Sequence, residues 1–175
     1  MESVSQPMKR RRIRALMTAC LGIRRADFSF DLALLAVRVV LAWIFIYYGA
    51  GKLFGAFNGP GIHQTAVFFS KTAHLNPGGF FAVFGGVMEL GGGIALALGF
   101  ISRFVGLALF GDMVMAMITV TWVNGFNSAS LNPGYELNIA IGVLALTVAL
   151  VGAGRFSVDS IIGRRLAETD KWPAN

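Results

Sequence analysis

Two acidic residues lie inside apolar stretches of this sequence that are long enough to cross a bilayer. Glu89 stands midway in the stretch 79–100, and Asp112 stands in the stretch 104–123. Placing a carboxylate at mid-membrane costs roughly 2.5 kcal/mol or more, so acids at that depth are functional candidates by default. Carboxyl groups donate and accept protons. Glu89 and Asp112 are therefore the first candidates for acid–base chemistry.

Arg38 is the candidate cation for these two acids. It lies about six residues, or roughly 9 Å, from the inner end of the apolar stretch 32–54. Its side chain can extend inward to the lipid headgroups or reach toward the acids, and we expect the second arrangement. Two acids that share one cation hold an exchangeable proton between them. The predicted catalytic group is Arg38 with Glu89 and Asp112.

Four glycines flank Glu89 at helical spacings of three, four and seven residues, which predicts that they share one face of a helix. They are Gly85, Gly86, Gly92 and Gly93. A stripe of small residues allows another helix, or a flat ligand, to come close. Close packing and a glycine-lined ligand slot both remain open at this point.

A second polar layer is predicted at the outer end of the helices. Lys52 ends the first apolar stretch and Glu136 opens the fourth. Such a pair is either an ion pair between helix ends or a contact for an anionic ligand. Lys52 and Glu136 therefore join the four glycines as candidate ligand-binding residues.

The composition requires a membrane environment around these residues. Hydrophobic residues make up 55% of the 175 residues and charged residues only 14%, against about 25% charge in soluble domains. The mean hydropathy is +0.67. Four apolar stretches approach the ~20 residues of a spanning helix, 32–54, 79–100, 104–123 and 135–151. We expect an all-α, four-helix transmembrane bundle with a short interfacial helix in the outer loop, 55–78.

The positions of the cations predict the orientation, because Lys and Arg are retained on the cytoplasmic side. With the N-terminus inside, twelve of the fifteen Lys and Arg residues fall in cytoplasmic segments. Both termini are therefore expected in the cytoplasm. The expected organisation is a basic tail over 1–30, a transmembrane domain over 31–160 and an amphipathic tail over 161–175.

Several other functions are disfavoured by the sequence. The basic cluster at 9–14 gives a pI near 10.1, but it lacks interleaved aromatic residues and precedes a span, so it is expected to bind the lipid bilayer and not nucleic acid. Cys20 is the only cysteine, which excludes an internal disulfide or thiol exchange. His63 and His74 both fall in the outer loop, so no metal or haem site is expected.

A series of motifs resembles the DoxX family. The motifs are Arg38 with the run 49–54, the run 88–93 followed by 98–103, Asp112, the run 134–137 and the closing run 152–159. Their order and spacing over about 31–160 carry the resemblance. The positions that match are Arg38, Lys52, Glu89, Arg155 and Asp159.

The resemblance implies a multi-pass protein of the bacterial or archaeal cytoplasmic membrane, linked to sulfur and thiol redox systems. A quinone would then bind near Glu89, Arg38 or Lys52 would polarise a carbonyl oxygen, and a redox partner protein would supply the electrons. Two alternatives stay open. Instead of a quinone-linked subunit, the chain could be a non-catalytic anchor that recruits a cytoplasmic partner. It could also be a small proton-linked transporter. A homodimer through the Gly51 and Gly55 pair is also compatible with the sequence.

Overall fold

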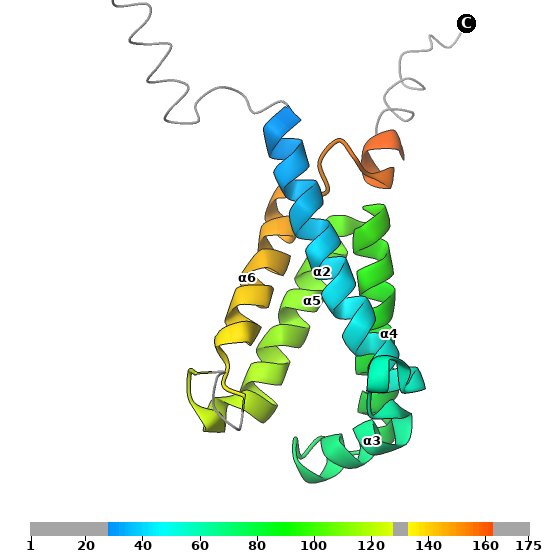
Figure 1. Ribbon diagram of the computed structural model, residues 1–175, viewed down its shortest axis with the longest axis vertical. Helices are drawn as coiled ribbons and strands as arrows, with labels where there is room; N and C mark the ends of the chain where they lie inside the picture. Colours follow the sequence, from blue (N-terminus) through cyan, green and yellow to red (C-terminus); the bar gives the residue numbers. More distant parts are fainter. Residues whose placement is uncertain (1–27, 128–132, 163–175) are drawn as a thin grey trace, which may run out of the picture.

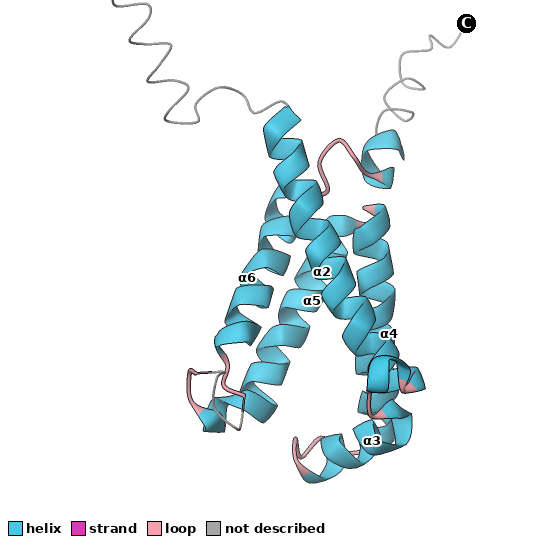
Figure 2. Cartoon of the chain, in the orientation of Figure 1, coloured by secondary structure: helices cyan, strands magenta, loops and turns pink. Residues whose placement is uncertain are grey.

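The structure is a computed structural model that describes residues 28–127 and 133–162. Most of the predicted tails, 1–30 and 161–175, and the basic cluster at 9–14 lie outside these residues. Within the described part every element is helical and no strand occurs (Figure 2). The expectation of an all-α protein is confirmed.

Five α-helices and three short helical turns lie within residues 28–151, and a further short helical segment covers 158–162. In order they are α2 (Phe28–Phe54), η1 (Ala56–Asn58), α3 (Gly61–Lys71), α4 (Gly78–Leu98), α5 (Ser102–Ala116), η2 (Met117–Thr121), η3 (Trp122–Asn124) and α6 (Glu136–Val151). The segment η2 is a π-helical turn that continues α5. Three helical stretches are long and apolar enough to cross a membrane, namely Phe28–Phe54, Gly78–Leu98 and Ser102–Asn124, and α6 is shorter at 16 residues.

The long helices are arranged as two antiparallel pairs, α2 with α4 and α5 with α6 (Figure 1). We call the end at which α4 leads into α5 the turn end, which contains residues 28–34, 97–103 and 151–160. The opposite end is the loop end, which contains 54–78, 117–127 and 133–135. The helix predicted in the outer loop is present as α3, which packs on α4 at the loop end (Figure 1).

Glycines allow close contact within each pair. A Cβ at Gly93 would lie 2.9 Å from Ile46 N on α2. A Cβ at Gly106 on α5 would lie 2.7 Å from Ala145 O on α6. Both distances are shorter than real Cβ contacts, so only glycine permits these approaches. Small residues thus set the helix spacing, as is common between membrane helices.

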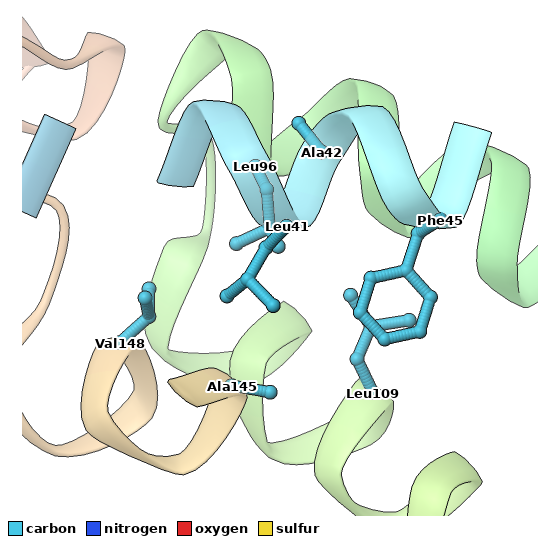
Figure 3. Packing of buried hydrophobic residues seen from close by; sticks show 7 residues of the cluster. All are labelled: Leu41, Ala42, Phe45, Leu96, Leu109, Ala145 and Val148. Carbon is cyan, nitrogen blue, oxygen red and sulfur yellow. The ribbon is translucent and has the colours of Figure 1, made fainter. Parts of the chain in front are cut away.

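A small apolar core joins all four long helices (Figure 3). Its buried members are Leu41, Ala42 and Phe45 of α2, Leu96 of α4, Leu109 of α5, and Ala145 and Val148 of α6. Along α2 this core lies between Arg38 on the turn-end side and Lys52 on the loop-end side. These two cations are 14 residues apart, or about 21 Å along the helix. The core therefore separates two groups of buried charges.

The outward faces of the helices are strongly apolar. Exposed side chains include Val39, Val40 and Trp43 on α2, Phe80, Val83, Phe84 and Val87 on α4, and Leu137, Val143 and Leu150 on α6. Arg38 and Glu89 are instead 0% and 3% exposed. Large contiguous apolar surface is rare on soluble monomers. Charges inside and apolar side chains outside are the arrangement that a lipid environment favours.

Candidate functional site

Lys52 and Glu89 form a buried ion pair between α2 and α4. Lys52 Nζ lies 2.6 Å from Glu89 Oε1. The Glu89 side chain is 4% exposed and the Lys52 side chain is 26% exposed. The sequence prediction paired Lys52 with Glu136, which opens α6, whereas in the structure the Lys52 ammonium group pairs with Glu89. The antiparallel register of α2 and α4 decides this, because the turn of α2 around Gly49 packs directly on Leu90.

Asp112 of α5 completes this polar group. Its carboxyl group lies within hydrogen-bonding reach of the Glu89 carboxyl group. Glu89 Oε2 and Asp112 Oδ2 are buried and have no hydrogen-bond donor. Two carboxyl groups hydrogen bond to each other only when one of them carries a proton. We call Lys52, Glu89 and Asp112 the polar triad. Its single cation faces two acids, so it can hold one exchangeable proton.

Two residues of α3 hold Lys52 in place. The Phe69 ring centroid lies 5.9 Å from Lys52 Nζ, within the range of a cation–π contact. Thr65 Oγ1 lies 3.4 Å from the Lys52 carbonyl oxygen and donates a shorter hydrogen bond, 2.7 Å, to the Gly61 carbonyl. The predicted outer-loop helix therefore has a definite role, because it covers the loop-end side of the polar triad.

Arg38 does not belong to this site, and its predicted pairing with Glu89 and Asp112 is wrong. Its guanidinium group is fully buried at the turn end and donates to four backbone carbonyl groups. The acceptors are Leu96 O at 3.0 Å from Nε, Ala153 O and Phe156 O at 2.7 and 2.9 Å from Nη1, and Ala97 O at 3.2 Å from Nη2. Arg38 thus ties the end of α4 to the segment that follows α6.

A local feature of α4 creates the place for Arg38. The helix ends at Gly99, which has φ 68° and is held by hydrogen bonds from Gly99 N to Leu96 O and from Phe100 N to Ala95 O. This left-handed residue turns the chain, and glycine adopts it without strain. A Cβ at Gly99 would collide with Arg38 Nη2 and Ser157 Cβ. The last carbonyl groups of a helix lack donors within the helix itself. Arg38 donates hydrogen bonds to two of them, Leu96 O and Ala97 O.

The other family-motif charges also serve the turn end. Asp159 accepts hydrogen bonds from Ile101 N at 2.8 Å and Ser102 N at 2.9 Å, so its carboxylate caps the start of α5. Asp31 accepts from Arg155 N at 3.0 Å and lies 3.3 Å from Arg155 Nε. We call Arg38, Asp31, Arg155 and Asp159 the turn-end lock. Apart from the Asp31–Arg155 ion pair, the hydrogen bonds of these side chains within the described residues go to backbone groups.

The four candidate glycines face three different neighbours. Gly86 and Gly93 pack on Leu53 and Ile46 of α2, Gly92 packs on Leu109 of α5, and Gly85 lies beside the Phe69 ring. The predicted single slot is therefore absent from these helices, because the chain's own side chains fill it. The packing alternative describes these glycines. Gly51 likewise packs closely on the backbone of Gly59 in the same chain.

An apolar groove of about 480 Å³ lies on the outer face of α4 and α5. Its lining includes Phe84, Val87, Met88 and Gly92 from α4 and Val105 and Leu109 from α5. Of the four candidate glycines only Gly92 borders it. Met88, the residue before Glu89, lines the groove, whereas Glu89 itself does not. In the part of the chain that the structure describes, no three His, Cys, Asp or Glu side chains gather as a metal site requires.

The fold and the polar triad define an apolar helical bundle with acid–base groups inside it. The chain matches the sequence model of the DoxX family over residues 33–122, just over half of its length. It therefore belongs to the DoxX family, and with its apolar helices it is a multi-pass membrane protein. The matched segment contains the whole polar triad but ends before α6. No curated protein and no solved structure matches the chain.

Proposed function

We propose that this chain is the membrane subunit of a redox system, with the polar triad as the acid–base site for a quinone. The observation that carries the proposal is the pair of buried carboxyl oxygens, Glu89 Oε2 and Asp112 Oδ2, that have no donor beside the Lys52–Glu89 ion pair. Helix packing alone needs one cation and one acid. A second acid, Asp112, is not needed for that pair, and a role in proton exchange with Glu89 accounts for its presence.

The residues present fit a quinone headgroup. A quinone takes up two electrons and two protons when it is reduced to a quinol. Lys52 has three N–H donors and uses one for Glu89, so it can donate another to a carbonyl oxygen. Glu89 and Asp112 pass on the one proton that they hold and then take up a second from the medium at the loop end, so the two protons are delivered in succession. The two electrons come from a reduced partner protein. The outer groove of α4 and α5 is wide and apolar enough for a hydrocarbon tail.

The proton reaches the polar triad from the loop end. On the turn-end side the buried core of Leu41, Phe45, Leu96 and Leu109 contains no polar side chain and blocks a path (Figure 3). On the loop-end side Lys52 is partly exposed, whereas Glu89 is not. Lys52 and the loop between α2 and α4 therefore connect Glu89 to the surrounding medium.

The proposal includes four membrane spans with both termini on the cytoplasmic side of a bacterial or archaeal cytoplasmic membrane. The distribution of Lys and Arg supports this orientation. The 16 residues of α6 extend about 24 Å, so this helix crosses a hydrocarbon core of about 30 Å only with the flanking residues around Tyr135 and Gly152. In this orientation the loop end and Lys52 face away from the cytoplasm.

The test is the quinone content of purified protein. Wild type, Glu89→Gln and Asp112→Asn are purified in detergent, extracted with organic solvent and compared with lipid-only controls by mass spectrometry. We expect enrichment in the wild type and its loss in both variants. Asp31→Asn is the matched control, because Asp31 is also a buried acid but lies in the turn-end lock.

Equal background levels in wild type and all variants would reject the quinone site. The second candidate, a non-catalytic anchor, would then stand, and the 2.6 Å Lys52–Glu89 pair would be a contact between helices only. Loss of quinone in the Asp31→Asn control as well would mean that the folded bundle is required, without a specific role for the polar triad.

A further inference from the structure

A second cavity lies at the turn end, well away from the polar triad. Its volume is about 470 Å³. It is bordered by the start of α5, including Ser102 and Arg103, by Gly152 and Gly154 after α6, and by Ser157 and Ser160. Gly152 and Gly154 have φ values of 94° and 72°, which turn the chain around the cavity. This wall contains three serine hydroxyl groups, one guanidinium group and the Asp159 carboxylate, unlike the apolar groove on α4 and α5.

The charges at the turn end do not balance. The described residues there include three arginines, Arg38, Arg103 and Arg155, and two aspartates, Asp31 and Asp159. Asp31 pairs with Arg155, and Asp159 is held by two backbone N–H groups near Arg38. One positive charge remains, and it belongs to Arg103. No described acid forms an ion pair with it.

The donors of Arg103 are also largely unused. Its single described hydrogen bond, from Nη2 to Val151 O, is long at 3.5 Å. An arginine carries five N–H donors in a planar fork that matches the oxygens of a phosphate group. The guanidinium group lies over the end of α6, since a Cβ at Gly152 would be 3.3 Å from Arg103 Nε. It is exposed at the border of the cavity and is free to bind.

A buried hydroxyl group points to a missing partner at the same place. Ser102 is 0% exposed, and its Oγ has no hydrogen-bond partner. The other two serines of the cavity are satisfied, since Ser157 Oγ donates to Gly154 O and Ser160 Oγ donates to Arg155 O, both at 2.6 Å. A buried hydroxyl group without a hydrogen-bond partner destabilises the fold. The unsatisfied Ser102 hydroxyl and the unpaired Arg103 border the same cavity, so a ligand with acceptor oxygens could bind both.

We propose that this cavity binds a phosphate-type oxyanion through Arg103 and Ser102. Arg103 supplies the charge and the forked donors, and Ser102 donates its unused hydroxyl proton. Asp159 also borders the cavity, and its negative charge is offset by the nearby guanidinium group of Arg38. The ligand is either the headgroup of an anionic phospholipid or free phosphate. The cavity lies where the apolar helices end, which is the depth of lipid headgroups.

The experiment compares full-length wild type with Arg103→Gln, Ser102→Ala and Lys71→Gln. Lys71→Gln is the matched control, because Lys71 is an exposed cation on α3 at the opposite end. Binding of phosphatidylglycerol and of phosphatidylcholine in detergent is titrated by native mass spectrometry. Inorganic phosphate is titrated separately by calorimetry. The phosphatidylglycerol arm tests the lipid source, and the phosphate arm tests the free anion.

We expect Arg103→Gln to weaken phosphatidylglycerol binding about fivefold, as one interfacial cation typically does. Ser102→Ala weakens it by a similar factor without lowering thermal stability, because the hydroxyl has no partner in the free protein. Phosphate binding with the same dependence on Arg103 would identify the free anion instead. Equal weakening by Lys71→Gln and Arg103→Gln, or no anion binding in either arm, would overturn the proposal.

Discussion

The turn-end lock and the polar triad both bury charges in an apolar bundle, but they treat those charges differently. In the turn-end lock, Arg38 is matched by four carbonyl oxygens and Asp159 by two N–H groups. In the polar triad, Lys52 faces two acids, and two carboxyl oxygens have no donor. A satisfied buried charge fixes structure, whereas an unsatisfied one keeps a capacity for chemistry. The difference separates the structural end of this molecule from its candidate functional centre.

The largest effect should follow the loss of the best-matched charge. Arg38→Met removes the guanidinium donors from four carbonyl groups at the end of α4 and after α6, which should lower the free energy of unfolding by about 3–5 kcal/mol. Equilibrium unfolding in mixed detergent, followed by circular dichroism, measures this change. Lys71→Met, at an exposed position, is the control. A loss below about 1 kcal/mol would show that Arg38 is not a central part of the lock.

A smaller effect is expected for the cap of α5. Asp159→Ala leaves Ile101 N and Ser102 N without their acceptor, and hydrogen bonds to charged groups contribute about 1.5–3 kcal/mol each. Water replaces part of this at a half-exposed position, so we expect a loss of about 2 kcal/mol. The same unfolding assay measures it. Asp159→Asn should recover part of the stability, since one side-chain oxygen still accepts. No difference between the two variants would contradict the capping role.

Substitutions in the polar triad should change the free energy of unfolding less than those in the turn-end lock. One variant should lower it, and a second substitution should partly restore it. Glu89→Gln removes the charge that faces Lys52 and should destabilise the fold by about 1–2 kcal/mol. The double variant Lys52→Met with Glu89→Gln removes both charges of the pair. It should be more stable than Glu89→Gln alone, because the buried cation is gone and Asp112 can stay protonated and hydrogen bonded to the introduced amide. A double-mutant cycle with Lys52→Met gives the coupling energy. A coupling near zero would mean that the 2.6 Å ion pair adds nothing to stability.

The smallest effect, and the most diagnostic, concerns Asp112. Asp112→Asn removes the acid that lacks a cation of its own and supplies an amide N–H₂ donor to Glu89. Stability should therefore stay equal or rise by up to about 1 kcal/mol, while quinone content falls. This separation of stability from ligand content distinguishes a functional acid from a structural one. A clear loss of stability in Asp112→Asn would place Asp112 with the lock.

Much of the fold was predictable because the length of each apolar stretch is a property of the chain itself. The three long apolar helices and the shorter α6 follow from hydrophobic stretches, and α3 follows from the glycine and proline residues that bound it. The choice of Glu89 and Asp112 as candidates needed only their depth in those stretches. The orientation in the membrane stays a prediction, and so does the quinone.

The partners of each charge were not predictable, and the errors have a common cause. Arg38 was expected with the acids, and Lys52 was expected with Glu136. Helical periodicity fixes the face of a residue on its own helix, but it does not fix the register between two helices. In this chain, close glycine contacts such as Gly93 on Ile46 fix that register. The left-handed Gly99 also opened the carbonyl groups that Arg38 occupies, and only the backbone shows this.

Composition and the length of the apolar stretches were enough to predict that this protein is helical and apolar and that it carries acids within its helices. Composition acts through solvation, and the cost of a charge in hydrocarbon does not depend on the details of packing. Tertiary structure alone decided which charges pair. In the folded protein Lys52 lies with Glu89 and Asp112, and Arg38 donates hydrogen bonds to backbone carbonyl groups at the turn end. Hydrogen bonds and ion pairs act over about 3 Å, so they depend on helix register and chain reversals that distant parts of the sequence set together.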